Sequence, residues 1–124
     1  FDPELVITGG ALGFDQALAQ ACLLTGADFH IYIPFVGFDL QWPDESRQRL
    51  RDLMDRAEKV EAVSVGPYRP WMMHRRNHEM VDSSDMVLAL WDGLESGGTA
   101  SCVEYAHQKQ KPVENIWSEW QQWT

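Results

Sequence analysis

The sequence predicts an α/β fold of three layers, with a mostly parallel sheet and helices on both of its faces. Two observations support this prediction. Short apolar runs rich in Val and Ile alternate with longer amphipathic stretches, and no internal repeat or low-complexity linker interrupts them. The strands are expected at Leu5 to Thr8, His30 to Pro34, Val60 to Val65, Met86 to Trp91 and Val113 to Trp117.

Helices are expected between these strands. Apolar residues recur at helical spacing from Asp15 to Thr25, and Gly26 follows at the usual C-terminal stop. Pro43 and Asp44 can start a second helix, which runs to Ala57. Further helices are expected from Trp71 to Ser83 and from Thr99 to Gln110. The tryptophan-rich tail, Trp117 to Trp123, is expected to form a short helical turn that packs on the domain or on a second subunit.

Length and composition favour one domain over residues 1–124. The chain is 44% hydrophobic, which is enough apolar surface to close a single core. No apolar stretch approaches the roughly 20 residues of a membrane helix, so we expect a cytoplasmic protein without a membrane partner. A formal charge of −9 argues against general nucleic-acid binding. Cys22 and Cys102 are expected to be reduced thiols, and the sequence implies no metal site and no cofactor.

A glycine-bearing loop, Thr8-Gly9-Gly10-Ala11-Leu12-Gly13-Phe14-Asp15, lies where the first strand turns into a helix. Gly9, Gly10 and Gly13 would let backbone N–H groups approach a ligand, and the start of a helix favours an anion such as phosphate. Asp15 has two interpretations. It caps the helix, or its carboxylate accepts a hydrogen bond from a ribose hydroxyl.

A second loop, Trp91-Asp92-Gly93-Leu94-Glu95-Ser96-Gly97-Gly98-Thr99, also leads from a strand into a helix. In open parallel sheets the ligand crevice lies beyond the carboxyl ends of the strands, where both loops are expected. Gly97 and Gly98 therefore become candidate ligand-binding residues. Thr99 is the N-cap, a phosphate-contacting hydroxyl, or both.

The segment from Met72 to Met80 contains Arg76, which shares a helix face with apolar residues. An inward arginine near glycine loops could bind phosphate, whereas the structural alternative is an ion pair with Asp82 or Asp85. His74 and His78 are four residues apart, but no third metal ligand is evident, so we interpret them as surface histidines.

Taken together, these three segments resemble the SLOG superfamily, which joins the DNA-processing protein A fold to the lonely-guy phosphoribohydrolases. The resemblance spans nearly the whole chain and is closest to small uncharacterised bacterial and phage members. It implies a Rossmann-like fold. Such proteins usually carry an earlier strand and helix, so this chain is expected to lack that N-terminal pair.

The lonely-guy enzymes use an MxxRKxxM helix and a PGGxGTxxE loop to cleave the N-glycosidic bond of nucleoside monophosphates. Arg76 and Asn77 match the arginine and the lysine of the first motif, with asparagine in place of lysine. The resemblance thus implies Arg76 as a catalytic group. Glu104 lies two residues beyond the position of the family's glutamate, and Glu104, Asp92 and Glu95 all stay open as the second carboxylate.

Two functions follow from these observations. The first is a sensor or sequestering module that binds a nucleotide or a nucleotide-derived ligand, with a homo-oligomer as the expected assembly. The second is a nucleoside 5'-monophosphate N-glycosidase, in which Arg76 would hold the phosphate. A structural or interaction domain, with the tryptophan-rich tail as its working surface, is the third interpretation.

Overall fold

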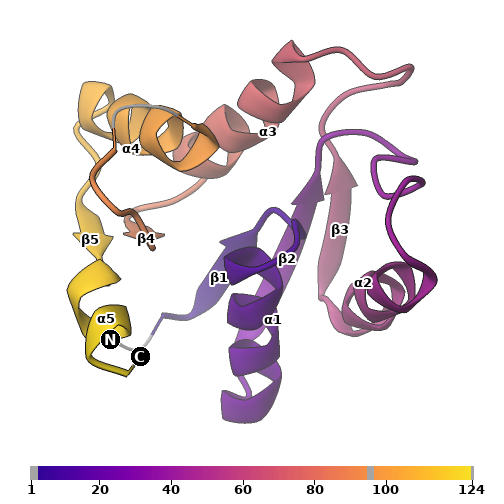
Figure 1. Cartoon of the computed structure of the whole chain (residues 1–124), viewed down its shortest axis with the longest axis horizontal. Coiled ribbons are helices and arrows are strands. Elements are labelled where there is room, and N and C mark those ends of the chain that lie inside the picture. The colour runs from indigo at the N-terminus through magenta and orange to yellow at the C-terminus, as the bar shows by residue number, and fades with distance from the viewer. Residues whose placement is uncertain (1–2, 95–96, 124) are drawn as a thin grey trace. The chain divides into compact units, whose positions relative to one another are not determined.

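The computed structural model describes residues 3–94 and 97–123, and the chain divides into two compact units, Phe1–Arg76 and Asn77–Thr124 (Figure 1). Each unit consists of parallel strands and helices, so the predicted α/β, Rossmann-like class is confirmed. That the two units form one domain stays a prediction.

The first unit contains a parallel sheet in the order β1-β2-β3, formed by Leu5–Thr8, Asp28–Ile33 and Lys59–Ala62. Leu5 is aligned with Asp28, and His30 with Lys59. Because β1 and β2 run parallel, their carboxyl ends lie at the same edge of the sheet, and the first glycine loop leaves β1 at this edge.

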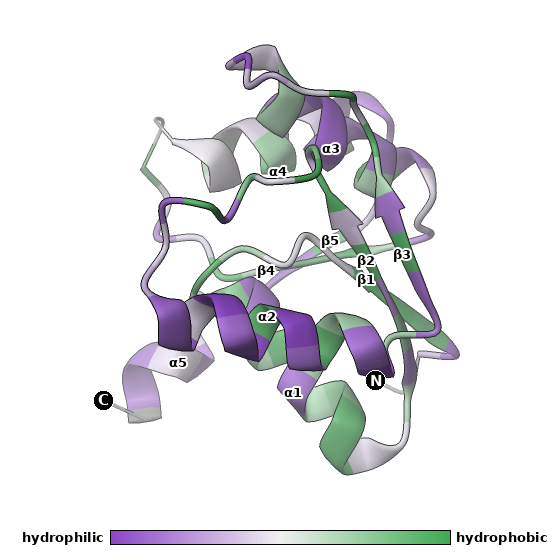
Figure 2. Ribbon diagram, turned by 90° about the vertical axis from the view of Figure 1, so that its right-hand side faces the viewer, coloured by the Kyte–Doolittle hydropathy of each residue, from purple (hydrophilic) through white to green (hydrophobic). Residues whose placement is uncertain are grey.

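Two helices of the first unit pack together beside this sheet. Helix α1 (Phe14–Thr25) contacts β1, β2 and α2 (Asp44–Arg56). Hydrophilic and hydrophobic segments alternate along the ribbon of α2 (Figure 2), and its buried residues Leu50 and Leu53 lie on one face, as expected of an amphipathic helix. Gly26 ends α1, and its N–H donates to the Cys22 carbonyl, as the sequence predicted. The buried core consists of Ala19, Cys22, Phe29, Ile31, Ile33 and Leu53.

Helix α3 (Trp71–Asp82) crosses the division between the units and leads into the second one. There, β4 (Val87–Ala89) and β5 (Val113–Asn115) pair in parallel. Helix α4 (Gly98–Gln108) packs on both strands, and α5 (Trp117–Trp123) ends the described chain. No helix within residues 3–94 and 97–123 has the length and apolar character needed to cross a membrane.

All the predicted strands and helices are present, but several strand ends differ from the prediction. The strand predicted to reach Val65 ends at Ala62, although the N–H groups of Val63 and Ser64 still donate to the carbonyls of Ile33 and Pro34. The strand predicted to reach Trp91 ends at Ala89. Beyond it the Asn115 side chain replaces a backbone partner, since Asn115 Oδ1 accepts from the Trp91 N–H at 3.0 Å.

Candidate functional site

The first glycine loop packs directly on the hydrophobic core. Gly10 has a φ of +71°, a conformation that L side chains rarely adopt. A Cβ atom on Gly10 would lie 3.0 Å from Ile31 Cγ2 and 3.3 Å from Leu50 Cδ1. Glycine at position 10 therefore lets the backbone turn over the core without a side chain intervening.

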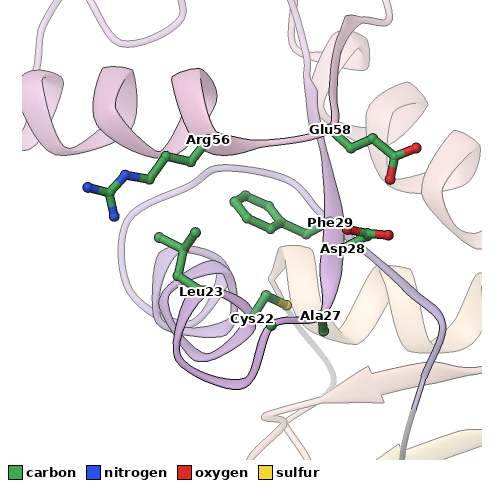
Figure 3. Close-up of a pocket in the computed structure, with 8 residues that line it drawn as sticks. Cys22, Leu23, Ala27, Asp28, Phe29, Arg56 and Glu58 are labelled. Atoms are coloured by element: carbon green, nitrogen blue, oxygen red, sulfur yellow. The ribbon is translucent and has the colours of Figure 1, made fainter.

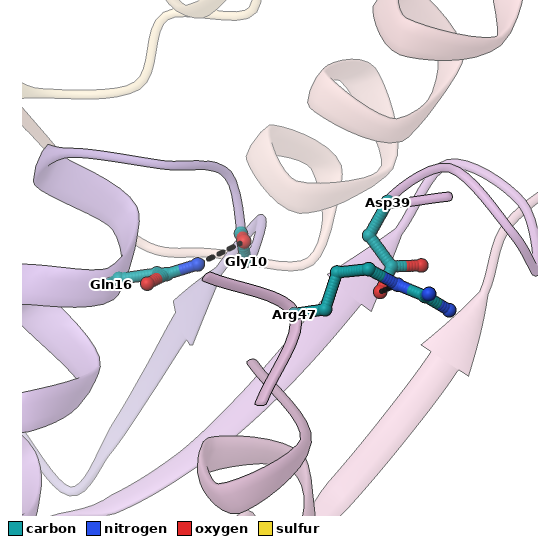
Figure 4. Close-up of polar contacts among 4 residues, drawn as sticks. All are labelled: Gly10, Gln16, Asp39 and Arg47. Carbon is teal, nitrogen blue, oxygen red and sulfur yellow. Dashed lines mark hydrogen bonds and ion pairs between the residues drawn. The ribbon is translucent and has the colours of Figure 1, made fainter. Parts of the chain in front are cut away.

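Two polar side chains, those of Thr8 and Gln16, hold this loop by hydrogen bonds, and neither role was predicted from the sequence. Thr8 is only 1% exposed, and its hydroxyl donates to the Asp15 carbonyl at 2.8 Å. Gln16 Nε2 donates to the Gly10 carbonyl at 3.3 Å (Figure 4). One signal could have revealed Gln16. It lies three residues before Ala19, on the buried side of α1, where a polar residue needs a hydrogen-bond partner.

The Arg76 side chain binds the backbone of the first glycine loop. The residue is 7% exposed, and Nη1 donates to the Gly9 carbonyl at 2.6 Å and to the Tyr32 carbonyl at 3.4 Å. The inward orientation predicted for Arg76 is thus confirmed. These two carbonyls belong to the first unit, and the charge of Arg76 also acts on the Asp15 carboxylate. The ion pair with Asp82 or Asp85 stays a prediction. Asp82 accepts a hydrogen bond from the Tyr105 hydroxyl at 2.8 Å.

The prediction that Asp15 caps α1 is wrong. The N-cap is Gly13, and the helix start has no side-chain cap. Asp15 Oδ2 instead accepts from the Ala11 N–H at 3.2 Å. Burial raises the pKa of Asp15 above its usual value, and the Arg76 guanidinium and the Ala11 N–H offset part of that rise. The Asp15 side chain therefore points toward the first glycine loop, where the Ala11 N–H and the positive charge of Arg76 both attract its carboxylate.

The raised pKa of Asp15 predicts a pH dependence of stability. The native carboxyl binds its proton more tightly than the unfolded one, so the free energy of unfolding falls as pH rises from the unfolded value of 3.8 through the native pKa. Asp15→Asn removes this titration. We expect the stability of the variant relative to the wild type to increase with pH, measured by urea unfolding between roughly pH 4 and pH 8.

The control for this experiment is Asp55→Asn, which removes one negative charge from an exposed position on α2. A difference between Asp15→Asn and the wild type that stays constant over the whole pH range would contradict the prediction.

The second glycine loop lies in the second unit. Gly97 is the N-cap of α4 with a φ of +103°, and no side chain caps the helix start, so the prediction of Thr99 as N-cap is wrong. Gly98 and Thr99 are exposed in the first turn of α4, which contains no acidic residue. Asp92 stabilises a turn that precedes α4, because Asp92 Oδ1 accepts a hydrogen bond from the Leu94 N–H at 3.0 Å. Glu95 and Ser96 lie outside the described residues.

The other predicted site residues have different environments. Asn77 is half-buried on α3, and Glu104 is exposed on α4. His78 stacks on Tyr105, with ring centroids 3.8 Å apart. That the two glycine loops share one ligand stays a prediction, because each loop belongs to a different unit.

A shallow hollow of about 410 Å³ opens at the opposite edge of the first unit's sheet, where β2 begins (Figure 3). Asp28, Arg56 and Glu58 supply charges of both signs at its wall, and Leu23 and Phe29 are among its apolar residues. Burial raises the pKa of the Cys22 thiol in this wall, which disfavours the reactive thiolate. Among the described residues, those that line the hollow include none from the first glycine loop.

The chain is similar to known proteins along nearly its whole length. A family model, YpsA, described as the YspA SLOG family, matches residues 2–118. SPbeta prophage-derived protein YoqJ of Bacillus subtilis is 32% identical, over 81% of this chain and 67% of that protein. UPF0398 protein BH1768 of Halalkalibacterium halodurans is 27% identical, over 87% of this chain and 60% of that protein. The chain thus spans 60–67% of the length of these two relatives.

The fold is shared with a solved structure. It is the crystal structure of a "putative molybdenum carrier protein" from Syntrophus aciditrophicus, with a TM-score of 0.62 and 19% sequence identity. The match covers 91% of this chain and 63% of that one.

Proposed function

The chain belongs to the YspA SLOG family, and on that premise we propose that it binds a nucleotide or a nucleotide-derived ligand, as a sensor or a sequestering module. The proposed ligand-binding residues are Gly9, Gly10, Gly13, Asp15 and Arg76 in the first unit, and Asn77, Asp92, Gly97, Gly98 and Thr99 in the second.

One observation supports this proposal above the others. Each glycine loop follows a strand of a parallel sheet and begins a helix: the first joins β1 to α1, and the second lies between β4 and α4. In parallel α/β proteins, ligands bind beyond the carboxyl ends of strands, and exposed N–H groups at helix starts favour phosphate.

The phosphate is best accommodated at the start of α4. Gly97, Gly98 and Thr99 are exposed there, and a Cβ atom on Gly97 or Gly98 would meet no atom within 4 Å. The first turn of α4 lacks acidic residues, whereas that of α1 contains Asp15. An anion at α4 is therefore not opposed by a carboxylate in that turn.

A second candidate function is hydrolysis of the N-glycosidic bond of a nucleoside 5'-monophosphate. Asp15 supports it, because a carboxyl with a raised pKa lies beside Arg76 in a glycine loop. Glu104, the other proposed catalytic group, is exposed on α4. Hydrolysis would release free base, whereas a binding module would leave the nucleotide intact.

The experiment combines binding and turnover. The 5'-monophosphates of adenosine, guanosine, cytidine and uridine are added at millimolar concentration, and thermal unfolding and free base are measured. A ligand present at one hundred times its Kd should stabilise the protein by about 2.7 kcal/mol. An unchanged melting temperature with all four nucleotides would overturn the binding proposal, and the absence of free base would overturn hydrolysis.

A variant tests the place of the phosphate. Gly98→Asp adds a carboxylate to the first turn of α4, which favours the helix but repels a phosphate. Because the space around Gly98 is open, both Gly98→Asp and its neutral control Gly98→Asn should fold. We expect Gly98→Asp to lose nucleotide binding and Gly98→Asn to retain it. Equal affinities for the two variants would place the phosphate elsewhere.

A further inference from the structure

The first glycine loop is poorly suited to an anion, although its glycines suggest a phosphate site. Two groups that would attract an anion are already engaged. Asp15 Oδ2 accepts from the Ala11 N–H, and Arg76 donates to the carbonyls of Gly9 and Tyr32. A phosphate entering the loop would meet the Asp15 carboxylate and be repelled by it.

Asp15 offers the opposite chemistry, that of a hydrogen-bond acceptor. An ionised carboxylate accepts hydrogen bonds and donates none. Oδ2 is used by Ala11, and among the described residues Oδ1 has no hydrogen-bond partner. The residue as a whole is half-buried, so part of its surface remains open to solvent.

The surrounding contacts hold this acceptor in place. Both Asp15 Oδ2 and Arg76 Nη1 lie within 2.8 Å of the position that a Cβ atom on Gly9 would take, so each packs against the glycine. The Thr8 hydroxyl donates to the Asp15 carbonyl and ties the backbone of the same residue to β1. Arg76 is thus a positioning residue for the loop and for Asp15.

We propose that the Asp15 carboxylate accepts a hydrogen bond from a sugar hydroxyl of the ligand, and that the first glycine loop binds this neutral, hydroxyl-bearing part instead of the phosphate. The inference rests on the proposed nucleotide binding and specifies it. The expected ligand is a ribonucleoside derivative with free sugar hydroxyls. A ligand that lacks these hydroxyls should bind more weakly.

The test varies the ligand first. Adenosine and guanosine 5'-monophosphates are compared with their 2',3'-dideoxy analogues by calorimetry on the wild-type chain. Loss of the hydroxyl donor to this acceptor should weaken binding by at least about tenfold, because the ligand would still cover the carboxylate but leave it without that hydrogen bond. This comparison needs no variant, so it stands even if a substitution at position 15 impairs folding.

The variants then assign the effect to Asp15. Asp15→Asn keeps an oxygen for the Ala11 N–H, and Asp15→Ala removes the side-chain acceptor. We expect Asp15→Ala to bind ribonucleotides at least about tenfold more weakly and to bind dideoxy analogues as the wild type does. Asp55→Asn, on the exposed surface of α2, is the control for the change of net charge and should leave every affinity unchanged.

Three outcomes decide between the alternatives. If dideoxy and ribonucleotides bind the wild type equally, the sugar contact is wrong while nucleotide binding stands. If Asp15→Asn tightens the binding of ribonucleotides, dideoxynucleotides and inorganic phosphate alike, the loop holds the phosphate and the inference is overturned. If the wild type binds none of these compounds, the proposed function fails together with the inference.

Discussion

Replacing Arg76 with alanine is expected to lower the free energy of unfolding by about 3–5 kcal/mol, among the largest effects of any single substitution in this chain. The guanidinium is buried and donates to the carbonyls of Gly9 and Tyr32. Its removal would leave these carbonyls, and the nearby Asp15 carboxylate, without the donor that offsets their burial. The change is measured by urea unfolding, as a shift in the midpoint urea concentration while the slope of the free energy against urea concentration stays the same.

Arg75→Ala is the matched control, because Arg75 is the preceding residue of the same helix but is exposed. It should change stability by no more than about 0.5 kcal/mol. Arg76→Lys should be intermediate, since an ammonium cannot reproduce the planar fork of donors. Equal effects of Arg76→Ala and Arg75→Ala would show that Arg76 does not hold the loop.

Gly9→Ala is the second substitution for which we expect a large effect. It should lower the free energy of unfolding by about 1–3 kcal/mol, because the added methyl group overpacks the loop. The added Cβ atom would lie 2.7 Å from Arg76 Nη1, 2.9 Å from Arg76 Cζ and 2.8 Å from Asp15 Oδ2. Each of these distances is too short for a normal contact, so the arginine and the aspartate must move. Thermal or urea unfolding measures the loss, and Gly98→Ala, which meets no atom within 4 Å, is the control.

A double-mutant cycle identifies the cause of this loss. In an Arg76→Ala background two of the three close atoms are absent, so Gly9→Ala should cost much less than in the wild type. Additive effects of the two substitutions would contradict a direct steric conflict between Gly9 and Arg76.

The predicted relationship to the SLOG superfamily is confirmed by the family model that covers residues 2–118. The motifs that led to it are local, and their glycines occupy turns in the structure. Gly9 and Gly10 follow β1, and Gly97 precedes α4. The proposed roles of these residues in ligand binding stay predictions that the experiments above test.

By itself the sequence determined which segments are helices and strands, the parallel α/β class, the place of the first glycine loop after β1 and the inward face of Arg76. These features follow from periodicity, from glycine and proline signals and from side-chain type, all of which act over a few neighbouring residues.

Only the tertiary structure decided what the polar side chains of the loop do. Arg76 and Gly9 are 67 positions apart, so no local pattern could assign the Gly9 carbonyl to that guanidinium. The same contact decided the role of Asp15. A carboxylate at a helix start usually caps the helix, but here the Ala11 N–H and the charge of Arg76 hold it over the loop. The physical reason is that a buried polar group takes whichever partner the fold brings to it, and that partner can come from a distant part of the chain.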